Sequence, residues 1–168
     1  KTKCDGEEKV RTHEKHIILR TSWVFGVHGN NFLKTMLRLI QEKESLNIVG
    51  DQWGSPASAS MLSDVTFKIV ATILKNKNFN DYGTYHVTND GETNWHAYAS
   101  LISSQAMKLN LKVKCPPDKI HAILTSEYPT AAKRPSNSRL NTDKLKKTFM
   151  LELPHWESEV KKVLREII

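Results

Sequence analysis

Short apolar runs alternate with segments of helical periodicity along most of the chain, and this alternation restricts the possible folds more than any other feature. Runs rich in apolar and β-forming residues at 16–22, 46–50 and 83–88 have the length and composition of strands. Amphipathic segments that begin near 31 and span about 59–75 lie between them. Because strands separated by helices pair in parallel, we expect an α/β fold built on a parallel sheet.

The remaining elements are predicted from local signals. Residues 1–14 are expected to form the end of a polar helix, and Thr93 is positioned to cap a helix that runs to about 108. Residues 111–138 contain four prolines and are predicted to be mostly irregular. A short helix is expected at 142–149, and Pro154 is expected at the first position of the last helix.

The strand expected at 16–22 has no strand–helix unit before it, although a parallel sheet needs neighbours at its edges. The chain also contains neither a Gly-x-Gly-x-x-Gly nor a Gly-x-x-x-x-Gly-Lys-Ser/Thr sequence. We therefore interpret the chain as the second half of a larger α/β domain, without a glycine-rich cofactor loop.

The charge of the chain is +7 and it is unevenly distributed. Residues 108–168 carry 13 Lys and Arg against 7 Asp and Glu, whereas residues 1–107 are almost balanced. A basic half suits a phosphate group or a nucleic acid, but a solvated lysine-rich surface is the simpler interpretation. The chain lacks the interleaved aromatic residues of a nucleic-acid-binding module, so we expect no nucleic-acid partner.

Several classes of protein are not supported by the composition. No apolar run is long enough to span a bilayer, and the first twenty residues contain no signal-peptide core, so we expect no membrane association. Two cysteines, Cys4 and Cys115, are too few for a disulfide framework, which favours a cytoplasmic protein. The seven histidines show no ligand spacing, and we predict no metal site.

Several sequence blocks, taken together and in this order, carry a resemblance to a known family. They are Lys3-Cys4-Asp5-Gly6, Arg20-Thr21-Ser22-Trp23-Val24-Phe25, Gly29-Asn30-Asn31-Phe32, Asp51-Gln52-Trp53-Gly54-Ser55-Pro56, Tyr85-His86 and the segment 128–140, which contains Arg-Pro-Ser-Asn-Ser-Arg-Leu. The chain resembles the dTDP-4-dehydrorhamnose reductases, a group of extended short-chain dehydrogenases. Members of this family reduce the C4 ketone of dTDP-4-dehydro-L-rhamnose with NADPH or NADH in nucleotide-sugar biosynthesis.

The resemblance implies a division of the chain into two parts. Residues 1–28 would end a Rossmann-like dinucleotide-binding domain. Residues 29–168 would form mostly a smaller, mixed α/β substrate-binding region, together with a returning Rossmann strand and helix. The same resemblance implies a dTDP-sugar substrate and a homodimer. Some relatives hold Mg²⁺ at the dimer interface, but Met61 stands where an acidic ligand would be needed.

The resemblance also assigns cofactor and catalytic residues. Lys3 would be the lysine of the Tyr-x-x-x-Lys motif, with the tyrosine four positions upstream and outside the chain. An ammonium group at this place stabilises the tyrosinate and hydrogen-bonds the cofactor ribose. Thr21 and Ser22 would line the nicotinamide end of the cofactor pocket. The chain by itself would therefore be inactive.

The residues implied to bind substrate are Trp23, Asn30, Asn31, Gln52, Arg134 and Arg139. A tryptophan can stack on a deoxysugar, exposed N–H groups at a helix start attract a diphosphate, and arginine binds phosphate through two hydrogen bonds. Each type of residue also has an ordinary structural use. Trp23 could belong to the core, Asn31 could cap a helix, and the arginines could form surface salt bridges.

Two functions of different classes remain open at this point. The first is the reductase, seen as its carboxyl-terminal portion. The second is a non-catalytic regulatory or binding subunit on the same fold, similar to the regulatory β subunit of methionine adenosyltransferase. The two differ in whether a dTDP-sugar is turned over or only the nicotinamide cofactor is bound.

Overall fold

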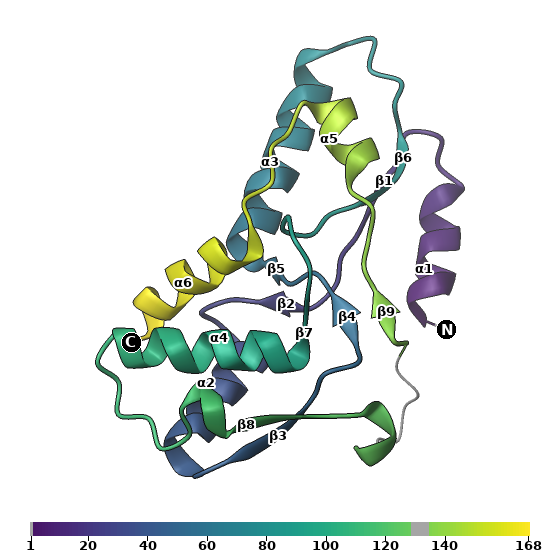
Figure 1. Cartoon of the computed structure of the whole chain (residues 1–168). Helices are drawn as coiled ribbons and strands as arrows, with labels where there is room; N and C mark the ends of the chain where they lie inside the picture. Colours follow the sequence, from purple (N-terminus) through teal and green to yellow (C-terminus); the bar gives the residue numbers. More distant parts are fainter. Residues whose placement is uncertain (1, 129–134) are drawn as a thin grey trace.

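The computed structural model describes residues 2–128 and 135–168 of the chain (Figure 1). The helices of these residues are α1 (Thr2–Arg11), α2 (Phe32–Glu42), α3 (Ala59–Lys75), α4 (Trp95–Lys108), α5 (Asp143–Phe149) and α6 (Trp156–Ile167). Their strands are β1 (Ile17–Arg20), β2 (Val24–Phe25), β3 (Leu46–Val49), β4 (Trp53–Gly54), β5 (Ala57–Ser58), β6 (Gly83–His86), β7 (Thr93–Asn94), β8 (Ile120–Ile123) and β9 (Asn137–Ser138).

Parallel strand pairs organise the chain, which confirms the expected α/β class. The two longest pairs are β1 with β6 and β3 with β8, and both are parallel over four residues of each strand. The shorter β2 and β5 are also parallel. Among the strands of the described residues, β7 alone runs antiparallel, against β4, whose other edge pairs in parallel with β9. Helices connect the members of each long pair, as parallel pairing requires.

The upper part of the molecule in Figure 1 contains β1, β6, α3 and α5. The helix α3 begins at the cap residue Ser58, whose hydroxyl accepts a hydrogen bond from the N–H of Met61 at 3.1 Å. Its buried residues Met61, Val65 and Ile69 recur at every fourth position, so they share one face. This face joins Tyr85 of β6 and the aromatic and aliphatic residues of α5 in one hydrophobic cluster.

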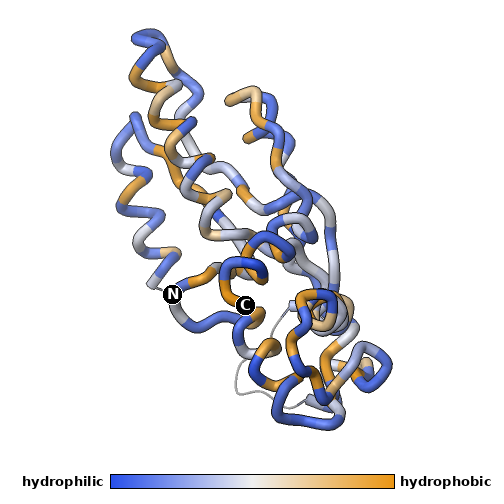
Figure 2. The backbone as a smooth tube through the Cα atoms, turned by 90° about the vertical axis from the view of Figure 1, so that its left-hand side faces the viewer, coloured by the Kyte–Doolittle hydropathy of each residue, from blue (hydrophilic) through white to orange (hydrophobic). Residues whose placement is uncertain are grey.

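The lower part of the molecule holds a second cluster, formed by α2, α4, α6 and the β3–β8 pair. Leu33, Met36, Leu37 and Ile40 of α2 are buried at helical spacing. They meet α4, whose Tyr98 and neighbours are also buried. Figure 2 shows hydrophobic and hydrophilic residues alternating along the helices, as expected for helices with one face in a core.

The first helix, α1, is attached differently, because none of its described residues is buried. Glu7 accepts two hydrogen bonds from Arg20 of β1, at 2.9 Å from Nε and 2.6 Å from Nη2. This pairing lowers the pKa of the Glu7 carboxyl and raises the pKa of Arg20. This contact holds α1 beside β1, the strand that precedes the candidate site.

Several predicted boundaries were wrong. The first helix ends at Arg11, and the first strand spans four residues, with Thr21 and Ser22 beyond its end. Asn94 caps α4, since its side chain accepts from the N–H of Ala97 at 2.8 Å, while Thr93 belongs to β7. The last helix begins at Trp156.

Residues 111–138 are more regular than predicted. They contain β8 and two 3₁₀ turns, η1 (Pro117–Lys119) and η2 (Thr125–Glu127), and β9 closes the segment. The expectation failed because β8 is short and its central residues, His121 and Ala122, are both exposed. The strand forms by pairing with β3, which a local pattern does not reveal.

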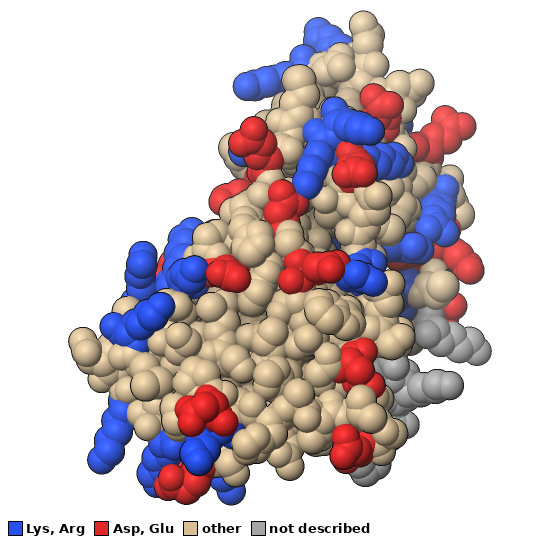
Figure 3. Space-filling view, viewed as in Figure 1, with Lys and Arg blue, Asp and Glu red and all other residues tan. Residues whose placement is uncertain are grey.

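Within the described ranges, no helix combines the length and apolar character needed to cross a membrane. The same residues contain no group of three His, Cys, Asp or Glu side chains that could hold a metal ion. Figure 3 shows Lys and Arg interspersed with Asp and Glu around a large uncharged area on this face.

Candidate functional site

The chain turns sharply at Trp23, directly after the carboxyl end of β1. Trp23 has a φ of 48°, which is unusual for a residue with a side chain. Ser22 anchors the turn, because its hydroxyl donates to the carbonyl of Ser55 at 2.9 Å. Ligands of open α/β sheets bind at the carboxyl ends of strands, so this turn is well placed for a functional site.

The Trp23 indole is held between two neighbours. One face stacks on Trp95 of α4, with ring centroids 3.6 Å apart and planes inclined by 17°. Its edge lies on Gly54 of β4, where an added Cβ would be only 2.6 Å from Trp23 Cε2. Trp23 is therefore packed by the core on one side, and it also lines the neighbouring cavity.

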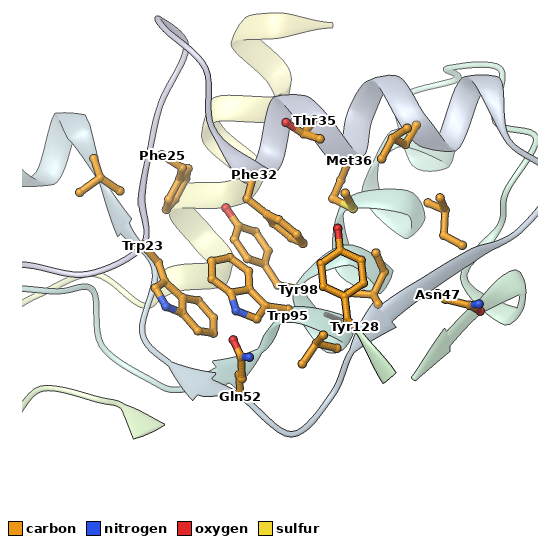
Figure 4. Close-up of a pocket in the computed structure, with 15 residues that line it drawn as sticks. Trp23, Phe25, Phe32, Thr35, Met36, Asn47, Gln52, Trp95, Tyr98 and Tyr128 are labelled. Carbon is orange, nitrogen blue, oxygen red and sulfur yellow. The ribbon is translucent and has the colours of Figure 1, made fainter. Parts of the chain in front are cut away.

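The cavity lies between β2, α2, β3 and α4 and has a volume of about 620 Å³. This volume is within the range of small-molecule sites. Aromatic residues from distant parts of the chain form much of its wall: Trp23, Phe25, Phe32, Trp95, Tyr98 and Tyr128. Figure 4 shows Gln52 beside the Trp23 and Trp95 indoles, with Asn47 at the far end. The cavity thus offers flat apolar surfaces with a few polar groups.

Gln52 is the polar side chain closest to the two indoles in Figure 4. It is only 7% exposed, and its amide nitrogen donates to the hydroxyl of Thr125 at 3.1 Å. Because that bond fixes the amide, the oxygen faces the other way, and Figure 4 shows it on the side of the indoles. Gln52 can therefore present an acceptor to a ligand in the cavity.

Asp51 ties this part of the cavity to the segment after β8. Its carboxylate accepts hydrogen bonds from the Thr125 N–H at 3.0 and 3.1 Å and from the Thr125 hydroxyl at 2.6 Å. These bonds to Thr125 lower the pKa of the Asp51 carboxyl. Neither residue was predicted to have a functional role.

Asn31 caps α2, as the structural alternative predicted. Its side-chain oxygen accepts from the N–H of Lys34 at 3.1 Å, and its amide nitrogen donates to the carbonyl of Gly26 at 2.8 Å. Both ends of the amide are therefore used within the protein. A contact of Asn31 or of the exposed Asn30 with a diphosphate stays a prediction.

Arg139 follows β9 and already has partners in the protein. Its guanidinium forms an ion pair with Glu92 at 2.8 Å and bonds the side chain of Asn137 at 3.0 Å. Arg134 lies outside the described residues. A phosphate contact of the two arginines therefore stays a prediction.

Lys3 lies on the first turn of α1, is exposed, and does not line the cavity. Thr21 is also exposed and Ser22 is half-buried, and neither is a wall residue. Of the residues predicted to bind substrate, the structure brings Trp23 and Gln52 together at one cavity. Of the others, the described residues Asn30, Asn31 and Arg139 are not wall residues.

The sequence reasoning missed most of the cavity wall. Phe32 stood in a quoted sequence block without an assigned role, and Trp95 and Tyr98 were assigned no role in a site. Tyr128 stood in a quoted sequence block but had no assigned role. The sequence does show that aromatic residues are concentrated just before α2 and at the start of α4. This concentration does not reveal that the rings meet around one cavity.

Comparisons with known proteins agree with these observations. The family model of the RmlD substrate binding domain matches residues 1–168. The dTDP-4-dehydrorhamnose reductase of Salmonella typhimurium is 43% identical over 168 residues, which is 99% of this chain and 55% of that protein. The corresponding protein of Escherichia coli K12 is 42% identical over 167 residues, covering 99% of this chain and 54% of its own length.

Solved structures give the same result. The dTDP-4-dehydrorhamnose reductase of Bacillus anthracis, solved in complex with NADP, superposes with a TM-score of 0.83 at 36% identity and covers 98% of this chain and 54% of its own. The Clostridium acetobutylicum protein superposes with a TM-score of 0.84 at 31% identity, covering 99% and 54%. The chain thus spans about half the length of these relatives. It belongs to the RmlD substrate-binding-domain family.

Proposed function

We propose that this chain is the nucleotide-sugar-binding part of a dTDP-4-dehydrorhamnose reductase. The protein that carries it would reduce dTDP-4-dehydro-L-rhamnose to dTDP-L-rhamnose with NADPH or NADH. The single observation that carries the proposal is the aromatic cavity of about 620 Å³ with Gln52 at its edge. The family match over residues 1–168 also supports this proposed function.

The cavity has the chemistry expected for a nucleotide. A pyrimidine base is flat and apolar on both faces, so it gains from contact with rings such as Trp95 and Tyr128. Its N–H group needs an acceptor when it leaves water, and the amide oxygen of Gln52 can supply one. The base would therefore be selected by stacking and by one directed hydrogen bond.

The reaction would take place beside the carboxyl end of β1. When bound, the reduced nicotinamide supplies the hydride that reaches C4 of the sugar. Lys3 would favour the phenolate form of the tyrosine that the family motif places four residues before it, and that tyrosine would give its proton to the ketone oxygen. Thr21 and Ser22 would border the nicotinamide, although the Ser22 hydroxyl is already bonded to Ser55.

The diphosphate would lie between the base cavity and the reaction site. Arg139 and Arg134 would contact it from the segment around β9, and Asn30 and Asn31 from the start of α2. For Arg139 this means that the exposed pair with Glu92 is shared or exchanged when the ligand binds. Such an exchange costs little, because exposed ion pairs contribute about 1 kcal/mol or less.

We also propose that the protein forms a homodimer through α3. Phe67, Val70 and Leu74 are 74%, 48% and 77% exposed and lie on one face of this helix. Asp64 and Lys75 stand near opposite ends of α3, so a second copy in antiparallel orientation would place unlike charges together. Sedimentation equilibrium of the protein and of Phe67→Lys would test this, and a monomer for both would contradict it.

The test of function is NADPH oxidation with dTDP-4-dehydro-L-rhamnose as substrate. It requires the full-length protein that carries this chain, with the 168-residue chain alone in parallel. We expect turnover by the full-length protein and none by the chain alone. A folded full-length protein that binds NADPH without turnover would instead favour the regulatory or binding subunit.

A further inference from the structure

The strands β3 and β8 end side by side, at one edge of the aromatic cavity. Val49 is opposite Ile123 in the parallel register, and the N–H of Gly50 donates to the carbonyl of Ile123 at 2.9 Å. The chain segments that follow the two strands are Asp51-Gln52 and Leu124–Tyr128. Both contribute to the cavity wall, through Gln52 and Tyr128.

Three side chains join these two segments beyond the end of the backbone pairing. The Asp51 carboxylate accepts three hydrogen bonds from the N–H and hydroxyl of Thr125. The Thr125 hydroxyl, having donated to Asp51, accepts from the amide of Gln52 at 3.1 Å. Hydrogen bonds to a carboxylate are stronger than those between neutral groups, so this is a firm connection.

The connection continues through η2 to Tyr128. The N–H of Tyr128 donates to the carbonyl of Thr125 at 3.2 Å, and the Glu127 carboxylate accepts from the N–H of Leu124 at 2.7 Å. A single short turn therefore transmits the position of Thr125 to Tyr128. Tyr128 is 55% exposed, so these bonds of η2 help to hold it at the cavity.

We propose that Asp51 and Thr125 form a latch that holds Tyr128 against the cavity and orients Gln52, and thereby sets the affinity of this site for a nucleotide. The two residues act as positioning residues, because neither lines the cavity itself. The inference rests on the proposed function, since it assumes that the cavity takes the nucleotide of the substrate. It adds that nucleotide affinity depends on a carboxylate that does not touch the ligand.

The structure favours a positioning role over a purely structural one. Asp51 and Thr125 are half-buried residues just beyond the ends of β3 and β8, and neither belongs to the hydrophobic cluster that these strands help to form. Their hydrogen bonds join the segment that supplies the polar Gln52 to the segment that supplies the exposed Tyr128. Loss of the latch should therefore free Tyr128 and Gln52 while the cores stay intact.

Binding of dTDP to the full-length protein, measured by isothermal titration calorimetry, is the first test. Thr125→Val removes the hydroxyl but keeps the shape and the N–H, and Asp51→Asn removes the charge. We expect each to raise the Kd of dTDP about tenfold, as for the loss of a charge-assisted hydrogen bond. Thr125→Ser, which retains the hydroxyl, should restore the affinity.

A matched control is available on α3, where the hydroxyl of Thr66 donates to the carbonyl of Leu62 at 2.7 Å. Thr66→Val makes the same chemical change far from the cavity and should leave the Kd of dTDP unchanged. In turnover, Thr125→Val should raise the KM for the dTDP-sugar with little change in kcat, because ground-state and transition-state binding are lost equally.

A double-mutant cycle separates the latch from general loosening of the site. Because the latch acts through Tyr128 and Gln52, Thr125→Val should weaken dTDP binding less in a Tyr128→Ala background and in a Gln52→Ala background than in the wild type. Effects that simply add would overturn the proposal. Wild-type affinity for dTDP in Thr125→Val and in Asp51→Asn would also overturn the proposal. Failure of the wild-type protein to bind dTDP would overturn the proposed function as well.

Discussion

Gly54 and Trp23 touch so closely that a side chain at position 54 would collide with the indole. A Cβ added to Gly54 would lie 2.6 Å from Cε2 and 2.7 Å from Cζ2 of Trp23. The indole is held in this position by stacking of its face on Trp95. The absence of a side chain at Gly54 thus allows the Trp23 indole to lie against β4.

Gly54→Ala should destabilise the protein by about 1–3 kcal/mol, because the indole or the strand has to move. Urea unfolding measures this change, and the intrinsic tryptophan fluorescence should shift as the stack is disturbed. The matched control is Gly6→Ala, since Gly6 lies within α1 and nothing surrounds its added Cβ within 4 Å. This control should be neutral or slightly stabilising. Equal stability of Gly54→Ala and wild type would contradict the contact.

Tyr98→Phe should stabilise the protein by about 1 kcal/mol or leave its stability unchanged. The Tyr98 hydroxyl is buried, and no described residue forms a hydrogen bond with it. Burial also raises the pKa of this phenol, so an ultraviolet titration should show one tyrosine that resists ionisation in the folded protein.

The control for this substitution is Tyr85→Phe, since the hydroxyl of Tyr85 donates to the carbonyl of Asp81. Removing that bond should cost about 0.5–1.5 kcal/mol in urea unfolding. If Tyr98→Phe proved as costly as Tyr85→Phe, the hydroxyl of Tyr98 would have a partner that the described residues do not show.

The contribution of Asp51 to stability should depend on pH. Its folded-state pKa lies below the ordinary value of 3.8 because Thr125 donates to its carboxylate. A lowered folded-state pKa stabilises the folded protein above the unfolded pKa, and this stabilisation disappears as the pH falls through the folded-state value. The stability lost in Asp51→Asn should therefore be full at pH 6 and shrink below about pH 4.

Denaturant unfolding of the wild type and of Asp51→Asn across this pH range measures the difference. Asp118→Asn provides the matched change at an exposed position of η1. A constant difference between Asp51→Asn and wild type from pH 6 to pH 3 would show that the ionised carboxylate has no role.

Arg139→Ala should weaken dTDP-sugar binding more than it changes folding stability. We expect the KM for the sugar nucleotide to rise about tenfold through the lost phosphate contact, with a small change in the free energy of unfolding. Arg38→Ala removes a comparable exposed ion pair, with Glu42 at 2.7 Å, and should leave KM unchanged. Equal losses of binding and stability in Arg139→Ala would assign Arg139 to the structure alone.

Lys3→Ala in the full-length protein should lower kcat and weaken NADPH binding while the protein remains folded. The physical reason is the loss of a positive charge beside the tyrosinate and the cofactor ribose. The exposed Lys9, on the same helix, gives the control Lys9→Ala. Unchanged kinetics in Lys3→Ala would remove Lys3 from the mechanism.

The helices were largely predictable because their signals are local. The apolar spacing of Met61, Val65 and Ile69 and the cap at Asn31 lie within a few residues of the elements that they define. Their burial follows from the repeat of the helix itself. The parallel pairing of β1 and β6 could also be expected, since helices separate the strands.

The cavity and its latch were decided only by the tertiary structure. Trp23 meets Trp95, and Asp51 meets Thr125, through contacts between residues that are far apart in the sequence. Strand β8 forms because its backbone pairs with β3, so no local sequence pattern predicts it. The sequence by itself determined the class of fold and the family. The folded chain decided which aromatic rings surround one space and which carboxylate holds its edge, because those contacts depend on how distant elements pack.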